Sequence, residues 1–492
     1  MVRAVGAVDR PGSALRIAID AEPVGSDIGT AADYTALQVF GPTALPLFRD
    51  EAAPVVPNLT SAKQARVVPL GALGFEVADG GCAITVWLDD HIFSDGRRVS
   101  VTDYARGFAR RLVDSTAPWR VFLRDLVGYE PGAGGNAKGL ADVPGLVVHR
   151  DRLTFRLRRP NYRWPQVLCC PAFSPEHPSD LRRTAGAYHV ANVSAAEVRL
   201  SANPDARAHL PDLTFLLIPD RYVGVNRYER GLLDVTCDTM FPYEWVDRYR
   251  GRDDFQTPPS AIAAVLRVHN FRHPLLADPD ARRALAQAID RSLLSSCLGG
   301  FARPLTSIAE APLLGGQDRR LHQTSAFAAC TVSTKPSDAC QLPARAGPKC
   351  ERPNLRLAYH DFYPNETIAT ALARQLALLV GKVELVREPY TSARSAADLR
   401  LELMYSPFLD PLSHLVTEAH CRSFIREREM WRAYIATVHA YQGEPDATKR
   451  APLLERASRL LAQHAHVIAL LRMPRFFLRR MLSRPDASTM AI

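Results

Sequence analysis

The sequence predicts an α/β protein, and three observations support this prediction. Segments with strand and helix periodicity alternate along the chain, most clearly between residues 355 and 404, where the spacing is that of a βαβ unit. Two helices begin at recognisable N-caps, Ser100 and Asp278. The chain has 492 residues, of which 47% are hydrophobic and 23% charged. This length and composition are typical of a globular protein with roughly three folding units or two large lobes.

In the N-terminal half, the elements follow from alternation and capping. Residues 15–20 alternate as a strand, and a Pro/Gly-punctuated region without a predicted element runs to about residue 71. Residues 82–88 alternate again, and a tight turn at 94–96 leads to Ser100, which begins a capping box with Asp103. The helix that follows has Tyr104, Phe108 and Leu112 on one apolar face, and residues 153–158 are a further strand.

The C-terminal half repeats the same pattern. Asp278 and Pro279 predict a helix start, and Leu355–Tyr359 predicts a strand. A helix over 366–380 is expected to end at Gly381. Strands are predicted at 383–386 and 399–404, and helices from 421 to 466. The segment of about 315–353 lacks periodicity, so we expect it to be a surface excursion from the second lobe.

Charge and hydropathy argue against two classes of partner. The 61 Lys and Arg residues against 52 Asp and Glu give a net charge of +9, but the basic residues are scattered and nearly all arginine. No basic run has interleaved aromatic residues, so we expect no nucleic-acid binding. No stretch approaches the roughly 18 apolar residues of a membrane span, which predicts no membrane insertion.

The first ten residues lack the apolar core of a signal peptide, and no lipobox-like cysteine occurs there. The localisation is therefore open. It is periplasmic or at the cell surface if a signal was removed, and cytoplasmic otherwise.

The nine cysteines do not have metal-site or thioredoxin spacing, because no CxxC occurs. Cys169 and Cys170 are adjacent, and we expect them to pack at the end of a strand rather than to act in catalysis. Cys330, Cys340 and Cys350 lie in the 315–353 excursion. They are surface thiols, or disulfide-linked if the protein is exported.

Several motifs in register resemble the family 5 extracellular solute-binding proteins, the peptide- and nickel-binding components of ABC importers. The most specific is Trp87-Leu-Asp-Asp-His-Ile-Phe-Ser-Asp-Gly96 followed by Val99-Ser-Val-Thr-Asp-Tyr104, which is similar to the family's strand, Phe-Ser-Asp-Gly turn and helix start. Further segments resemble family motifs in the same order: Gly186–Tyr188, Leu200–Pro204, Glu229–Asp234, Asp280–Arg291 and Tyr405–Pro411.

This resemblance implies a two-lobed periplasmic-binding-protein-like fold (type II), with a hinge between the lobes and an extra subdomain in the first lobe. Lobe I is expected to comprise residues 14–40, 180–265 and 470–492, the extra subdomain 41–179, and lobe II 266–469. The implied function is to enclose a small peptide-like or other small polar metabolite between the lobes, for ABC-type uptake. The implied protein is a monomer without a cofactor, and an ABC permease is its candidate partner.

The departures from the family pattern concern the ligand. Asp410 matches the Asp-Pro aspartate, and the residue three before it, which in peptide binders is an aspartate that pairs with the ligand's ammonium, is Pro407. The family's tryptophan falls at Met404. We therefore expect Tyr405, Phe408 and Met404 to contact ligand, and Asp410 and Pro407 to be structural at the cleft. The ligand is expected to lack a free α-amino group or to present it elsewhere.

Two alternative functions stay open from the residues alone, an enzyme of specialised metabolism built on the binding-protein scaffold and a ligand sensor. No catalytic residue is predicted. His414, Glu418, His420 and Cys421 cluster in the sequence, but we expect a solvated surface there rather than a metal site. His464 and His466 are expected to point apart if both lie on a helix, so that they would not share a metal.

Overall fold

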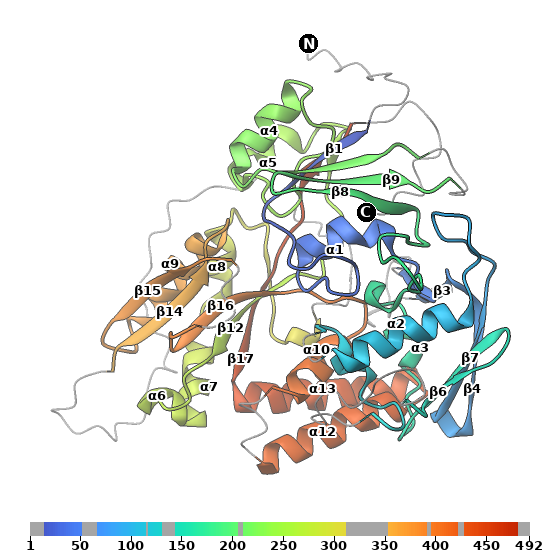
Figure 1. Cartoon of the computed structure of the whole chain (residues 1–492). Helices are drawn as coiled ribbons and strands as arrows, with labels where there is room; N and C mark the ends of the chain where they lie inside the picture. Colours follow the sequence, from blue (N-terminus) through green and yellow to red (C-terminus); the bar gives the residue numbers. More distant parts are fainter. Residues whose placement is uncertain are drawn as a thin grey trace.

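The computed structural model describes residues 14–51, 66–114, 117–129, 143–204, 210–310, 353–390, 395–421 and 428–480. Three mixed or antiparallel sheets organise these residues, and each is the centre of one structural unit (Figure 1). Two small two-stranded sheets accompany them. The predicted α/β class is confirmed.

The sheet of lobe I has the strand order β1-β10-β9-β8. Its strands are β1 (Leu15–Ile19), β10 (Leu213–Leu217), β9 (Glu197–Ala202) and β8 (Tyr188–Val193). Because neighbouring side chains of a strand point to opposite faces, Ile17 and Ile19 of β1 pack toward α1 (Tyr34–Phe40), whereas Ala18 packs toward α4 (Arg221–Glu229).

The extra subdomain is built on an antiparallel sheet with the order β4-β5-β7-β6. Helix α2 packs on it through Tyr104, Phe108 and Leu112, as predicted. Its capping box is present, since Asp103 Oδ2 accepts from the Ser100 backbone N–H at 2.8 Å. The subdomain's elements are β2 (Phe48–Glu51), β3 (Arg66–Pro69), β4 (Ala72–Ala78), β5 (Ala83–Leu88), α2 (Val101–Val113), β6 (Leu146–Val148), β7 (Arg152–Arg156) and α3 (Trp164–Val167).

Lobe II contains a six-stranded sheet with the order β13-β17-β12-β16-β14-β15. One face packs against α7, α8 and α9, and the other against α10 and α13. The strands are β12 (Ala263–Val268), β13 (Arg303–Pro304), β14 (Leu355–His360), β15 (Val383–Glu388), β16 (Leu399–Met404) and β17 (Val467–Arg472). The helices are α6 (Pro274–Ala277), α7 (Pro279–Ala288), α8 (Arg291–Ser296), α9 (Asn365–Leu376), α10 (Leu412–Ala419), α12 (Arg428–Gly443) and α13 (Ala447–His464).

Two crossovers connect the lobes. They lie between β11 (Phe255–Gln256) and β12, and between β17 and β18 (Phe477–Leu478), and β11 pairs with β18. The Met473 backbone N–H donates to the Ile262 carbonyl at 2.9 Å, so the two crossovers lie side by side. The domain division at 265/266 and 469/470 remains a prediction, and these positions fall inside β12 and β17.

Some sequence predictions were wrong in detail. The Pro/Gly-punctuated region before residue 71 contains α1, β2 and β3. The helix predicted for 366–380 ends at Leu376, although Val380 stays buried. Cys169 and Cys170 follow α3 rather than a strand. The excursion with Cys330, Cys340 and Cys350 lies largely outside the described residues. Within the described residues, no helix is long and apolar enough to cross a membrane.

Candidate functional site

Lobes I and II touch where β16 ends. Tyr405 follows the last residue of β16, and its ring lies 5.0 Å from the ring of Tyr34, centroid to centroid, in an edge-to-face arrangement. Tyr34 is the first residue of α1, in lobe I. This position agrees with the rule that ligands of open α/β sheets bind beyond the carboxyl ends of strands.

A buried polar network of Asp238 and Arg475 holds the hydroxyl group of Tyr34 in place. Its hydroxyl donates to Asp238 Oδ2 at 2.6 Å, and the Nε of Arg475 donates to the same oxygen at 2.6 Å. Arg475 lies on the second crossover, and its guanidinium carbon lies 5.8 Å from the centroid of the Tyr34 ring. Burial raises the pKa of Tyr405 to about 12, so this phenol is neutral and available as a donor at physiological pH.

A second contact between the lobes joins Tyr390 to Asp33. The Tyr390 hydroxyl, just after β15, donates to Asp33 Oδ2 at 2.6 Å. Asp33 is the N-cap of α1 and also accepts from the Ala36 backbone N–H at 2.7 Å. Nearby, Asp20 follows β1 and accepts from the hydroxyls of Thr35 and Thr239 at 2.8 and 2.7 Å. Burial raises the pKa of both carboxyl groups.

Asp50 brings a third carboxyl group to the region, from strand β2 of the extra subdomain. Its Oδ2 accepts from the Leu409 backbone N–H at 2.7 Å, and its buried Oδ1 has no hydrogen bond of good geometry among the described residues, although the Cys169 thiol lies beside the carboxyl group. Burial raises its pKa to about 6. In the described part of the chain, Asp20, Asp33 and Asp50 form no ion pair, whereas Asp238 pairs with Arg475. The region where the lobes meet therefore holds three carboxyl groups that are not paired with a cation.

Asp410 fixes the loop after β16 to the extra subdomain. It is fully buried, and its Oδ2 accepts from the Nε of Arg163 at 3.1 Å. Its Oδ1 accepts from the Leu412 backbone N–H at 2.9 Å, at the start of α10, and from the Tyr441 hydroxyl at 3.3 Å. These contacts agree with a structural role for Asp410.

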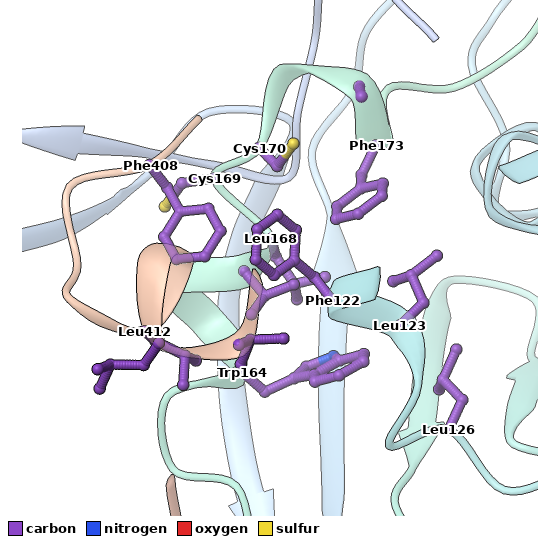
Figure 2. Close-up of a cluster of buried hydrophobic side chains, with 14 of the residues drawn as sticks. Phe122, Leu123, Leu126, Trp164, Leu168, Cys169, Cys170, Phe173, Phe408 and Leu412 are labelled. Carbon is purple, nitrogen blue, oxygen red and sulfur yellow. The ribbon is translucent and has the colours of Figure 1, made fainter. Parts of the chain in front are cut away.

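A cluster of buried apolar side chains lies next to Arg163 and Asp410 in the sequence, since Trp164 follows Arg163 and both Phe408 and Leu412 are two residues from Asp410 (Figure 2). Phe408 is 2% exposed, and its ring centroid lies 5.0 Å from that of Phe122 of the extra subdomain. We call the group that it joins the subdomain–lobe II cluster. Its members are Phe122, Leu123, Leu126, Trp164, Leu168, Cys169, Cys170, Phe173, Phe408 and Leu412. Helices α10, α12 and α13 reach toward the subdomain at this place (Figure 1).

The structure separates the predicted site residues. Tyr405 lies between the lobes, whereas Met404 points to the other face of the sheet, where its sulfur accepts from Arg267 Nη2 at 3.7 Å. Phe408 packs inside the subdomain–lobe II cluster, and Pro407 is buried. The ligand contacts of Tyr405, Phe408 and Met404 remain predictions. Of the three, Tyr405 has the position best suited to a ligand contact, because only its ring lies between the lobes.

The expectation that His464 and His466 point apart was wrong. His464 is the last residue of α13, and Ala465 takes a left-handed conformation with φ of 50°. The chain therefore changes direction before His466, which leads into β17. The two Nδ1 atoms come to 2.7 Å from each other. His420 instead faces Arg124, with 3.0 Å between its Nδ1 and the arginine Nη1.

Sequence reasoning missed most of the polar residues between the lobes: Asp20, Asp33, Tyr34, Asp50, Asp238, Tyr390 and Arg475. One signal was present for Asp20, since it directly follows a predicted strand. The others come from segments far apart in the chain. Asp238, for example, is separated by 204 residues from Tyr34 and by 237 from Arg475.

Comparisons with known proteins agree with this geometry. The model of the bacterial extracellular solute-binding proteins, family 5 (middle region), matches residues 66–411. A curated relative, the probable deoxycholate-binding periplasmic protein YgiS of Escherichia coli, is 24% identical over 449 residues, with 84% of this chain and 81% of the relative covered.

Solved structures of similar proteins share the fold over nearly the whole chain. The murein tripeptide binding protein MppA of Escherichia coli has a TM-score of 0.75 at 19% identity, covering 96% of this chain and 94% of that one. The OppA of Haemophilus influenzae in complex with RPPGFSPFR has a TM-score of 0.74 at 17% identity, covering 96% and 95%. The unliganded open form of MppA has a TM-score of 0.63 at 20% identity, covering 97% and 95%.

A two-lobed α/β fold with paired crossovers and polar contacts between the lobes defines a binding protein of the periplasmic type. Because the family model matches most of the chain, this chain belongs to the bacterial extracellular solute-binding proteins of family 5.

Proposed function

We propose that this chain binds a small, positively charged solute between its lobes and passes it to an ABC-type importer. The observation that carries the proposal is the excess of carboxylate between the lobes. Asp20, Asp33 and Asp50 form no ion pair in the described structure, and the buried Oδ1 of Asp50 has no charged donor, only the weakly donating Cys169 thiol beside the carboxyl group. A buried acceptor without a strong donor costs free energy, which a ligand ammonium group would recover.

The ammonium group would approach Asp50 rather than position 407. Pro407 offers no charge, as the sequence predicted, but Asp50 Oδ2 accepts from Leu409, only two residues further along the same loop. The positive charge of Arg163 also acts on Asp50, yet Arg163 is ion-paired with Asp410. Asp50 of the extra subdomain would thus take the ammonium-binding role that an aspartate at position 407, in the loop after β16, has in peptide binders.

Similar proteins support a peptide-like solute. One of them is named for a murein tripeptide, and another is seen with a nonapeptide. Membership of the family supports export to the periplasm or cell surface. Of the functions that the sequence left open, uptake has the support of the family match, and no observation favours an enzyme.

Titration calorimetry with unmodified and N-acetylated di- to pentapeptides tests the proposal. Free-amino peptides should bind more tightly than N-acetylated peptides. Asp50→Asn should lower the affinity for free-amino peptides about tenfold, the loss expected for one charge-assisted hydrogen bond. Since a bound cation stabilises the carboxylate, binding near pH 6 should release protons, and affinity should fall as the pH drops below 6.

Asp95→Asn is the matched control, because Asp95 pairs with Arg183 and His177 on a surface turn outside the region between the lobes. It should bind like wild type. Preference for the N-acetylated peptides, or tight binding of the anion deoxycholate by wild type with no change in Asp50→Asn, would contradict a cationic ligand.

A further inference from the structure

A second group of donor atoms lies in lobe II, on the face of the sheet that α10 and α13 cover. Glu418 is on α10, Cys421 follows that helix, and His466 immediately precedes β17. The ligand-type atoms of these three residues all lie within 4.8 Å of one another. His466 and Glu418 are fully buried and Cys421 is half-buried, so the expectation of a solvated surface around Glu418 was wrong.

The distances suit a tetrahedral transition metal after a small adjustment. His466 Nε2 lies 2.8 Å from Glu418 Oε2. Ligand atoms at about 2.0 to 2.3 Å from a zinc ion are roughly 3.3 to 3.8 Å apart, so the histidine–glutamate pair would open slightly to admit the ion. Sulfur, nitrogen and oxygen donors together favour zinc and related first-row divalent cations over calcium or magnesium.

The surrounding residues orient His466 for coordination through Nε2. Its Nδ1 lies 2.7 Å from Nδ1 of His464, so one ring nitrogen is already occupied by a hydrogen bond. Such a contact to the second nitrogen of a ligating histidine is a regular feature of metal sites. The left-handed conformation of Ala465 brings the two rings together, an uncommon conformation for a residue with a Cβ.

The net charge of the group also favours a bound cation. Arg267 donates to Glu402 Oε2 at 2.8 Å and to both oxygens of Glu418 at 2.8 and 3.0 Å. One guanidinium therefore faces two carboxylates. With Cys421 as a thiolate, the group has two negative charges in excess, which a divalent cation would neutralise.

A fourth donor of the right kind is close along the helix. His414 precedes Glu418 by four residues, which places the two on the same face of α10. It is 2% exposed, and its Nε2 has no hydrogen-bond partner among the described residues.

We propose that Glu418, Cys421 and His466 bind one zinc-type divalent cation that ties α10 to the start of β17. On metal binding the Cys421 thiol would lose its proton to solvent. His466 would stay neutral and change tautomer, with its proton on Nδ1 donated to His464 Nδ1, so that Nε2 coordinates the cation; His464 would then carry its own proton on Nε2. This site lies away from Tyr405 and does not depend on the solute. The role is structural, because the ion joins two elements inside one lobe.

Metal titration of the chelator-treated, untagged protein tests the site. We expect one equivalent of Zn²⁺ to bind and to raise the melting temperature, whereas Mg²⁺ has no effect. Co²⁺ should give a thiolate-to-cobalt charge-transfer band. Cys421→Ser, at a half-buried position, should abolish the band and weaken Zn²⁺ binding at least tenfold. Binding should also weaken at lower pH, because protons compete for the histidine and the thiol.

Two variants serve as controls. Cys297→Ser removes a half-buried cysteine at the end of α8, and His420→Gln removes the neighbouring histidine that faces Arg124. Both should bind zinc like wild type. A protein that takes up no zinc, or a Cys421→Ser variant that keeps wild-type affinity and the cobalt band, would overturn the proposal and leave the group a hydrogen-bonded network only.

Discussion

Arg163→Met is expected to lower the free energy of unfolding by about 3 to 5 kcal/mol, the usual cost of leaving one partner of a buried ion pair without the other. The side chains of Arg163 and Asp410 are 6% and 1% exposed, and their sequence neighbours Trp164, Phe408 and Leu412 belong to the subdomain–lobe II cluster. Removing the guanidinium leaves the buried Asp410 carboxylate without its cation, and the Leu412 N–H and the Tyr441 hydroxyl are its remaining donors among the described residues. Urea denaturation of the ligand-free protein measures the loss.

A double variant separates the charge from the packing. Arg163→Met combined with Asp410→Asn removes both charges, and it should recover a substantial part of the lost stability. Arg183→Met breaks a more exposed pair with Asp95, whose side chains are 46% and 24% exposed, and should cost less than about 1 kcal/mol. Equal losses for Arg163→Met and Arg183→Met would show that the buried pair does not hold the extra subdomain to lobe II.

Tyr405→Ala should weaken solute binding by about 1 to 3 kcal/mol, or roughly 5- to 150-fold, if the ring packs on the ligand. Tyr405 is the predicted site residue that the structure places between the lobes, where its ring meets Tyr34. Truncation removes the apolar ring and the neutral phenol together. Titration calorimetry with the free-amino peptides measures the change.

Tyr405→Phe keeps the ring and should stay close to wild type, so it reports how much the hydroxyl contributes. Tyr222→Ala is a control on the surface of α4, in contact with Arg221 and Trp245. It should leave the affinity unchanged. A Tyr405→Ala variant indistinguishable from wild type would remove Tyr405 from the binding site.

Local signals predicted the fold well where one segment determines its own structure. The Ser100 capping box and the Asp278 N-cap appear at the predicted positions, and β16 has the predicted ends, Leu399 and Met404. The prediction named no element before residue 71, where α1 is only seven residues long and five of its residues are buried. A short buried helix of this kind is stabilised by packing against a sheet, which no local pattern reveals.

The candidate site was harder to predict, because its residues meet only after both crossovers have formed. Asp33 and Tyr390 are 357 residues apart, and Asp50 and Leu409 are 359 apart. The motif around Asp410 led to Tyr405 by position, but it gave no information about Asp50. The histidines at 464 and 466 were misjudged for a different reason, since the helix ends between them.

The central claim is that lobes I and II close over a solute, and small-angle X-ray scattering tests it most directly. The peptide with the tightest binding in the titration is added to the protein at saturating concentration, with an N-acetylated, non-binding peptide as the control. We expect the radius of gyration to decrease only with the binding peptide, because the lobes rotate about the crossovers at 257–262 and 473–476. An unchanged radius of gyration at verified saturation would contradict closure over the ligand.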